Sequence, residues 1–379
     1  MAAKEPQDEW KVRHLPSLDG LRGVAALVVV LVHSISRVGV GKTILDAIHD
    51  TPFSPFFNPK IAVQVFFVLS GFVLTGSLLR NRSIRQLPQF YVRRLFRIHP
   101  PYVFALVIAW IVSFQYRPVR HEISQFGEVL FNIRLSVDEL LGFMLFPGGA
   151  GMQLPVGWTL QIEMIFSLLL PVMLWFALRT HVLLLLGLCL IPFWIGPWGH
   201  PIFKFSLDFA LGMAIYLHGD ALRAGFSRIG NAGVWGWVLA ALVIGGTPLY
   251  LNWPWLIDGG SRGSIFLQSI GSAGLVAAAA HAPAFTRLFV GRRCVFLGMI
   301  SYSVYLLHWP IAVLVASVPW PGSDALMMPL VVALTIPIAT VSYYVVERPS
   351  VRAGNWVCAK LALRSGRVAL TSRVGSVDR

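Results

Sequence analysis

Residues 20–38 read GLRGVAALVVVLVHSISRV, a run of 19 residues that is apolar almost throughout. Its length matches the roughly 20 residues that an α-helix needs to cross the hydrocarbon core of a bilayer. The run follows 19 mostly polar residues and lacks a convincing cleavage site, so we expect a membrane anchor rather than a removable signal peptide. Arg22 and His33 are its two functional candidates.

The composition extends this apolar character to the whole chain. Of 379 residues, 56% are hydrophobic and 13% are charged, against roughly 25% charged in an ordinary soluble domain. A disordered protein is excluded because disorder requires low hydrophobicity. The net charge of +14 does not indicate a nucleic-acid-binding protein, since there is too little polar sequence to build a basic face. We therefore expect an all-α, polytopic membrane protein.

Ten apolar runs are long enough to predict membrane-spanning helices. They lie at 20–38, 61–79, 98–114, 158–178, 182–196, 201–218, 232–250, 264–281, 295–317 and 325–345. A further apolar stretch, 140–146, is too short to cross and predicts a re-entrant or surface helix.

Lys and Arg residues orient these helices. With both termini in the cytoplasm, 22 of the 31 cations lie in inner segments and 8 in outer segments, which fits the positive-inside rule. We expect a cytoplasmic segment 1–19, a transmembrane domain 20–349 and a basic cytoplasmic tail 350–379. The tail is expected either to lie on the inner leaflet or to be a frayed basic end.

Ionisable residues inside spans are functional candidates because a membrane makes them costly. Helix positions place His33, Glu163, Asp208 and His308 in one layer of the outer half of the bilayer, whereas His281 falls at an inner end. The alternative is that Glu–His or Asp–Arg pairs only hold helices together. No CxxC or HExxH pattern is present, so we expect no metal.

Arginines at the predicted inner boundary suggest an anionic ligand. Arg22 shares one face of a helix with His33, roughly 16 Å away along the axis, which suits a long substrate with an anionic head. Arg93, Arg94 and Arg97 could clamp a polyphosphate through bidentate contacts. Ordinary positive-inside anchoring is the alternative for all four residues.

Several motifs, in order along residues 15–350, resemble those of the acyltransferase-3 family of membrane acyltransferases. They are LDGLRG at 18–23 with His33-Ser34, FFVLSGF at 66–72, RRLFRIHP at 93–100, GWTLQIE at 157–163, SYSVYLLHWP at 301–310 and ERP at 347–349. Thr159 stands where the family usually has Ser.

The resemblance implies a ten-helix fold in a bacterial inner membrane. It implies transfer of an acyl group, commonly acetyl, from cytoplasmic acyl-CoA to a hydroxyl of a carbohydrate or glycosylated acceptor. Some members carry an outer SGNH-type domain after the last helix, and the basic tail here predicts a stand-alone member.

The resulting hypothesis assigns roles along an acyl-CoA path. Arg22, Arg93, Arg94 and Arg97 hold the donor, His33 is the general base, and Glu163 orients His33 as a carboxylate does in a triad. We expect acceptor or thioester contacts from Trp158, Asp208, Ser301, Tyr302, Tyr305 and His308. Aromatic packing is the alternative for the Trp and Tyr residues.

Two questions stay open at this point. An acyl-His intermediate and direct transfer are equally compatible with these residues. The alternative function is a transporter or flippase for a lipid-linked or acylated sugar, because intramembrane carboxylates and histidines also mark such carriers.

Overall fold

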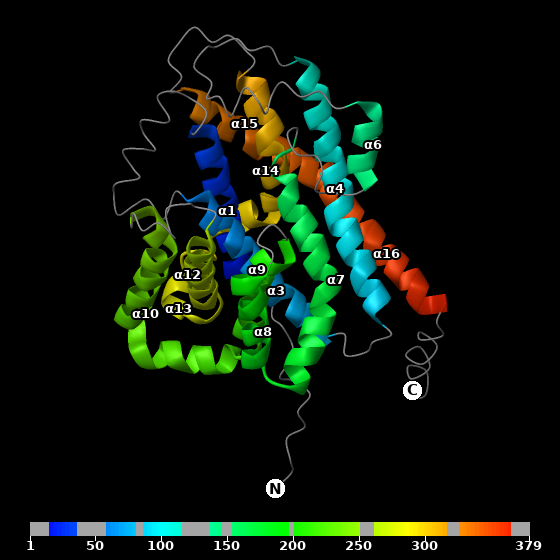
Figure 1. Ribbon diagram of the computed structural model, residues 1–379. Helices are drawn as coiled ribbons and strands as arrows, with labels where there is room; N and C mark the ends of the chain where they lie inside the picture. Colours follow the sequence, from blue (N-terminus) through cyan, green and yellow to red (C-terminus); the bar gives the residue numbers. More distant parts are fainter. Residues whose placement is uncertain are drawn as a thin grey trace, which may run out of the picture.

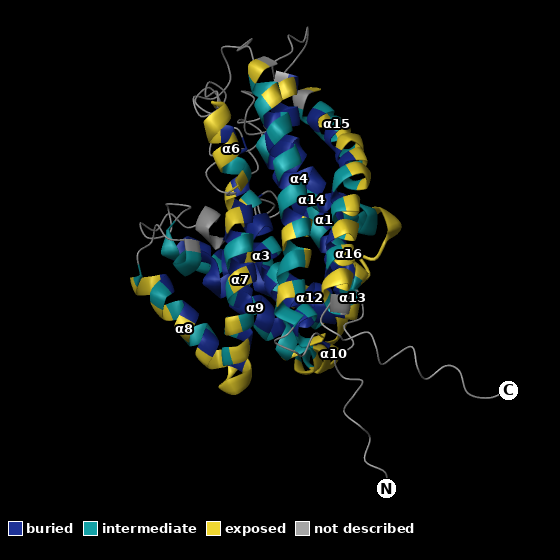
Figure 2. Ribbon diagram, turned by 90° about the vertical axis from the view of Figure 1, so that its right-hand side faces the viewer, coloured by how far each residue is buried: buried dark blue, intermediate teal, exposed yellow. Residues whose placement is uncertain are grey.

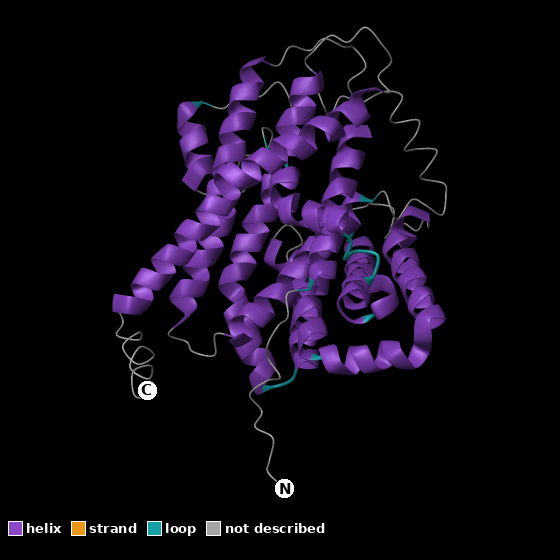
Figure 3. Cartoon of the chain, turned by 180° about the vertical axis from the view of Figure 1, so that it is seen from behind, coloured by secondary structure: helices purple, strands orange, loops and turns teal. Residues whose placement is uncertain are grey.

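The computed structural model describes residues 15–35, 58–80, 86–115, 136–145, 154–196, 201–250, 261–316 and 326–364. Within these ranges the chain forms helices and no strand (Figure 3). The helices are α1 (Pro16–Ile35), α3 (Pro59–Arg80), α4 (Leu87–Gln115), α6 (Val137–Leu145), α7 (Gly157–Arg179), α8 (Val182–Ile195), α9 (Pro201–Leu217), α10 (Gly219–Tyr250), α12 (Arg262–His281), α13 (Pro283–Thr286), α14 (Arg292–Ala316), α15 (Met327–Ser342), the π-helix η5 (Tyr343–Glu347) and α16 (Arg348–Arg364) (Figure 1).

The all-α, polytopic fold is confirmed, and a helix occupies each of the ten predicted spans. Eight described helices are long and apolar enough to cross a membrane. The other two predicted spans form shorter helices, with 17 residues in α9 and 14 in α8. The stretch at 140–146 falls on α6, whose 9 residues extend only about 14 Å.

Helix starts follow local chemistry. Asn58 precedes α3, and its side-chain oxygen accepts a hydrogen bond of 2.9 Å from the backbone N–H of Lys60. Ser261 caps α12 by accepting from the backbone N–H of Ser264. These polar residues satisfy backbone donors that the first turn of a helix leaves without partners.

The outer surface of the bundle is apolar, as a lipid-facing surface should be. Leu168, Val172 and Trp175 of α7 are exposed, as are Leu183 and Ile191 of α8. Figure 2 shows exposed stripes along the peripheral helices and buried residues along the central ones. In water, contiguous apolar patches of this kind are rare on a monomer, so the surface supports a membrane location.

Helices α1 and α14 pack closely in the centre of the bundle. Gly23 of α1 lies against the backbone of Gly298 of α14, and a Cβ atom on either glycine would collide with the other helix. The helices run parallel, since residues farther along one contact residues farther along the other. His33 and His308 each follow these glycines by ten residues, so the close packing brings both histidines to one height.

Two features differ from the predicted topology. Helix α10 contains a kink at Gly230, whose φ is 65°, and Figure 1 shows its first part running across one end of the bundle. The described part of the predicted tail, residues 350–364, is helical, because η5 continues directly into α16, and residues 365–379 lie outside the described residues. Helix α16 packs on α4, where the Ser350 hydroxyl donates to the carbonyl of Phe96 and Gly354 lies against the Phe96 ring.

Candidate active site

A cavity of about 530 Å³ lies among α1, α3, α4, α7, α14 and α16. Eight of the twelve predicted site residues line it: Arg22, Arg93, Arg94, Arg97, Glu163, Ser301, Tyr302 and Tyr305. The other four, His33, Trp158, Asp208 and His308, lie outside its lining.

The lining carries more positive than negative charge. Five arginines line the cavity, the four predicted ones and Arg80, against two carboxylates, Asp19 and Glu163. Asp19 lies 3.7 Å from Arg22 on the next turn of α1. This excess of cations favours a ligand with several negative charges.

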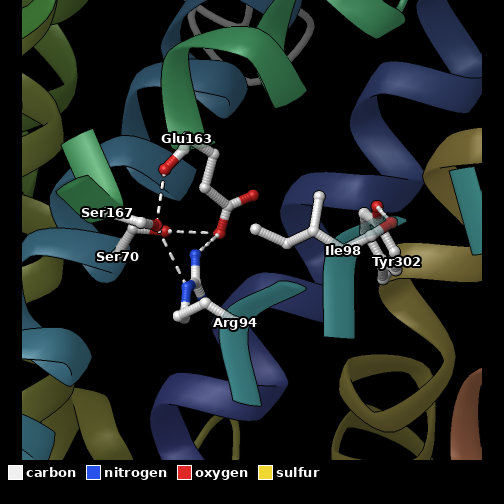
Figure 4. Close-up of polar contacts among 6 residues, drawn as sticks. All are labelled: Ser70, Arg94, Ile98, Glu163, Ser167 and Tyr302. Atoms are coloured by element: carbon white, nitrogen blue, oxygen red, sulfur yellow. Dashed lines mark hydrogen bonds and ion pairs between the residues drawn. The ribbon is translucent and has the colours of Figure 1, made fainter. Parts of the chain in front are cut away.

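Arg94 is held by a network of side chains rather than directed only at the cavity (Figure 4). Its Nη2 lies 2.6 Å from Oε1 of Glu163, and its Nε donates to the Ser167 hydroxyl at 3.1 Å. The Ser70 hydroxyl donates to the same Glu163 oxygen at 3.2 Å. The pair is only 12% and 23% exposed, so it joins α4 to α7 in a largely buried position.

Glu163 therefore takes a different place from the one expected. We predicted that it would orient His33, but the described contacts of its carboxylate are with Arg94 and Ser70. The reason is that α4 packs against α7 and places an arginine beside the carboxylate. A buried carboxylate needs such a cationic partner.

The remaining arginines of the predicted clamp are more accessible. Arg93 and Arg97 are exposed, whereas Arg94 is not. A guanidinium at a water boundary can meet a soluble phosphate group through two hydrogen bonds. The geometry thus separates one arginine that joins helices from two that face the cavity with exposed side chains.

The tyrosines of α14 form a wall of the cavity and connect helices. The Tyr302 hydroxyl donates to the carbonyl of Ile98 at 2.7 Å (Figure 4). The hydroxyls of Tyr305 and Thr159 lie 3.0 Å apart, beside the carbonyl of Val156. Both tyrosines thus bond to neighbouring helices or their ends, in addition to lining the cavity.

Trp158 and Ser301 make local contacts. Trp158 packs against the rings of Phe67 and Phe205, with centroids 6.2 and 5.6 Å away. The Ser301 hydroxyl donates to the carbonyl of Gly298 within its own helix at 2.8 Å. The alternative of aromatic packing thus describes what Trp158 does in this structure.

His33 and His308 are in direct contact. Nδ1 of His33 lies 3.0 Å from Nε2 of His308, and Nδ1 of His308 lies 2.7 Å from the carbonyl oxygen of Tyr305. The ring planes are inclined by 16° with centroids 5.3 Å apart. With these two nitrogens 3.0 Å apart, the ring centroids cannot be much farther apart than the observed 5.3 Å. The two rings therefore lie edge to edge in nearly the same plane, so that the N–H of one ring can point at the nitrogen lone pair of the other.

Asp208 lies apart from this group. It is fully buried in α9, where neither carboxyl oxygen meets a described donor at good hydrogen-bond geometry, although the Ser269 side chain lies close to it. His281 packs against Phe72 and Gly219, separate from the other histidines as its position predicted.

Three residues with a place in the site were not predicted. Ser70 and Ser167 hold the Glu163–Arg94 pair. Glu347 is buried, accepts a hydrogen bond of 2.8 Å from the Ser303 hydroxyl, and lies within electrostatic range of Arg97. The signal for Glu347 was present in the ERP motif at 347–349, but the residue falls just beyond the last predicted span.

Comparisons with known proteins identify the family of this chain. A family model described as an acyltransferase domain matches residues 15–346. The O-acetyltransferase OatA of Staphylococcus aureus (strain NCTC 8325 / PS 47) is 24% identical over 97% of this chain and 62% of its own length. A protein of S. aureus (strain COL), named provisionally as an O-acetyltransferase, is 25% identical over 91% of this chain and 59% of its own.

The chain spans about three fifths of the length of these relatives. No solved structure matches it. The family model covers most of the chain, including every residue that lines the cavity except Val351 and Asn355. On this match and on the motifs within it, the chain belongs to the acyltransferase-3 family.

Proposed function

We propose that the protein is an O-acyltransferase of the bacterial inner membrane. It transfers an acyl group, acetyl in the simplest case, from cytoplasmic acyl-CoA to a hydroxyl of a carbohydrate or glycoside. The observation that carries this proposal is one cavity that joins a set of cations to a residue in contact with the histidine pair. Five arginines line the cavity, and so does Tyr305, whose carbonyl oxygen lies 2.7 Å from Nδ1 of His308. The family membership and the O-acetyltransferase names of its relatives support the same reaction.

The donor would bind through its phosphates. Arg93, Arg97 and Arg80 are exposed cations of the cavity, and Arg22 lies deeper, on the helix that leads to His33. The diphosphate and 3′-phosphate of CoA provide several anionic groups for such a cluster. The pantetheine arm would then extend along α1 and carry the thioester toward the histidine pair.

The transfer step needs a base beside the acceptor hydroxyl. His33 takes the hydroxyl proton while the acceptor oxygen attacks the thioester carbonyl. The C–O bond forms, the C–S bond breaks, and the thiolate of CoA recovers the proton from the imidazolium. The products are the O-acyl acceptor and CoA with a free thiol, so atoms and charge balance in direct transfer.

Purified protein in lipid nanodiscs tests the proposal. With acetyl-CoA and a panel of glycosides, we expect release of CoA thiol in equal amount to acetylated acceptor. Protein carrying His33→Ala provides the background, and His281→Gln, which changes a buried histidine outside the site, is the matched control. A wild-type protein that leaves acetyl-CoA intact but moves a sugar lipid across vesicles would instead establish the transporter alternative.

The acceptor can be identified from cells. Mass spectrometry of surface glycans and secreted glycosides from a deletion strain and its parent should show the loss of one O-acyl modification. Unchanged acylation of every glycan and glycoside in the deletion strain would contradict the proposed acceptor class.

The native cysteines test the proposed orientation. Cys189 and Cys358 are buried, whereas Cys294 at the start of α14 is more accessible. With both termini in the cytoplasm, Cys294 lies on the cytoplasmic side. A membrane-impermeant maleimide should label it in inside-out vesicles only, and Cys294→Ser should abolish the label. Labelling from the outside of intact cells would reverse the orientation.

A further inference from the structure

The contact between His33 and His308 specifies where each ring carries its protons. The carbonyl oxygen of Tyr305 is an acceptor only, so Nδ1 of His308, at 2.7 Å, must carry a proton and donate it. In a neutral imidazole the other nitrogen then bears a lone pair. Nε2 of His308 is therefore the acceptor in its contact with His33.

The same reasoning extends to His33. Its Nδ1 lies 3.0 Å from the Nε2 acceptor of His308, so it must be the donor. The rings lie edge to edge with planes 16° apart, which directs the N–H at the lone pair. A neutral His33 with a protonated Nδ1 carries its lone pair on Nε2.

A charged alternative is less favourable. If His308 carried two protons, both of its nitrogens would donate and the order of the chain would reverse. His308 is fully buried, and its two ring nitrogens meet a carbonyl oxygen and an imidazole, neither of which carries the negative charge that would compensate an imidazolium for its lost hydration. The neutral pair therefore has one hydrogen-bond order: His33 to His308 to the Tyr305 carbonyl.

We propose that His308 is a positioning residue that holds His33 in the Nδ1–H tautomer, so that Nε2 of His33 is the atom that accepts the acceptor's hydroxyl proton. This rests on the proposed function and replaces the expected role of His308 as a substrate contact. When Nε2 takes the proton, the imidazolium of His33 is stabilised through its Nδ1–H by the Nε2 lone pair of His308. The Tyr305 carbonyl completes the arrangement that a carboxylate provides in a triad.

The tautomer can be measured without turnover. We would record the ¹⁵N spectrum of histidine-labelled protein in bilayers and assign the His33 resonances by their loss in His33→Gln. We expect a protonated Nδ1 and an unprotonated Nε2 in the wild type, and a change to the Nε2–H form in His308→Leu. His281→Gln is the matched control and should leave the His33 resonances in place. An Nε2–H form of His33 in the wild type would overturn the proposal.

A pair of substitutions separates positioning from packing. The amide of glutamine in His308→Gln reaches the place of Nε2 and offers an oxygen to His33, whereas His308→Leu fills the space with no acceptor. We expect His308→Leu to lower kcat about tenfold, as the loss of one hydrogen bond predicts, with an unchanged KM for acetyl-CoA. His308→Gln should restore most of the rate. Equal losses in the two variants would overturn the proposal.

The two measurements also distinguish this proposal from the function itself. A protein with the expected tautomer that never consumes acyl-CoA would refute the proposed reaction and leave the hydrogen-bond order standing. An active acyltransferase whose His33 carries its proton on Nε2 would refute the positioning role alone.

Discussion

The arginine-lined part of the cavity and the histidine pair differ in how their side chains are held. Arg93 and Arg97 are exposed, and three further arginines share the same cavity. His308 is fully buried and bonded at both ring nitrogens, to His33 and to the Tyr305 carbonyl. The first region contains accessible cations, namely Arg80, Arg93 and Arg97, whereas the second is a fixed arrangement built on two helices in backbone contact.

This difference indicates which region sets affinity and which sets rate. Several exposed cations can share a flexible polyanion, so each contributes a part of the binding energy. Proton transfer requires one nitrogen at one position, and no neighbouring group can take over when that nitrogen is removed. Substitutions should therefore change KM in the first region and kcat in the second.

The largest effect is expected at His33. His33→Ala should lower kcat roughly 10²- to 10⁴-fold, the range for loss of a general base, and leave KM for acetyl-CoA within about twofold. Steady-state kinetics on nanodisc preparations with matched protein levels measure both constants. A variant with wild-type kcat would show that His33 takes no part in the chemical step and that the histidine pair does not set the rate.

The next effect concerns the Arg94–Glu163 pair, which belongs to the cavity but is held rigidly. Glu163→Gln should cost about 3 kcal/mol of stability, because it leaves a largely buried arginine without its partner. The double variant Arg94→Gln/Glu163→Gln should recover much of that loss. Thermal unfolding in detergent measures the cycle.

A matched control pair is present on α10. Arg223 and Asp220 lie 3.5 Å apart with side chains 64% and 96% exposed, so Asp220→Asn should change stability by less than about 1 kcal/mol. Equal effects at the buried and exposed pairs would show that Glu163 does not hold α4 to α7.

A smaller effect is expected at the accessible arginines. The double variant Arg93→Gln/Arg97→Gln should raise KM for acetyl-CoA about tenfold, near the lower range for charge-assisted hydrogen bonds, with little change in kcat. The effect should shrink at high salt because exposed charges are screened. Arg228→Gln, at an exposed arginine outside the cavity, is the control. A drop in kcat at constant KM would place these arginines in the chemical step.

The smallest effect is expected at Asp208. Asp208 is fully buried and has no ion-pair partner among the described residues, so its carboxyl group is held in the neutral form. Asp208→Asn then exchanges one neutral group for another of similar shape and should leave stability nearly unchanged. Differential scanning fluorimetry measures this, with Asp220→Asn as the exposed control. A marked loss of stability would show that the Asp208 carboxyl group makes a stabilising hydrogen bond. A selective loss of activity would support its predicted role as a substrate contact.

The contacts of the site were less predictable than its residues. Helix positions placed Glu163, His33 and His308 at similar depth, but depth alone does not say which neighbour a side chain meets. Glu163 meets Arg94, 69 residues away, and His33 meets His308, 275 residues away. Both pairings depend on which helices pack together and on the rotation of each helix about its axis.

The continuation of the last helix shows a second limit. Basic residues after 350 predicted a tail, because positive charge commonly follows a last span. The structure instead continues through η5 into α16, which packs on α4 and contributes Val351 and Asn355 to the cavity. A π-helical turn requires only a local change in hydrogen bonding, and it leaves no strong mark in hydropathy.

The sequence by itself determined the membrane class, the places of the ten predicted helices and eight of the residues that line the cavity. It could do so because a run of apolar residues must satisfy its backbone internally in lipid and therefore forms a helix. Only the tertiary structure decided that Arg94 holds Glu163 and that His308 holds His33. Those pairings follow from close packing of helices distant in sequence, such as Gly23 on Gly298, and contact across such distances is a property of the packed bundle rather than of any one helix.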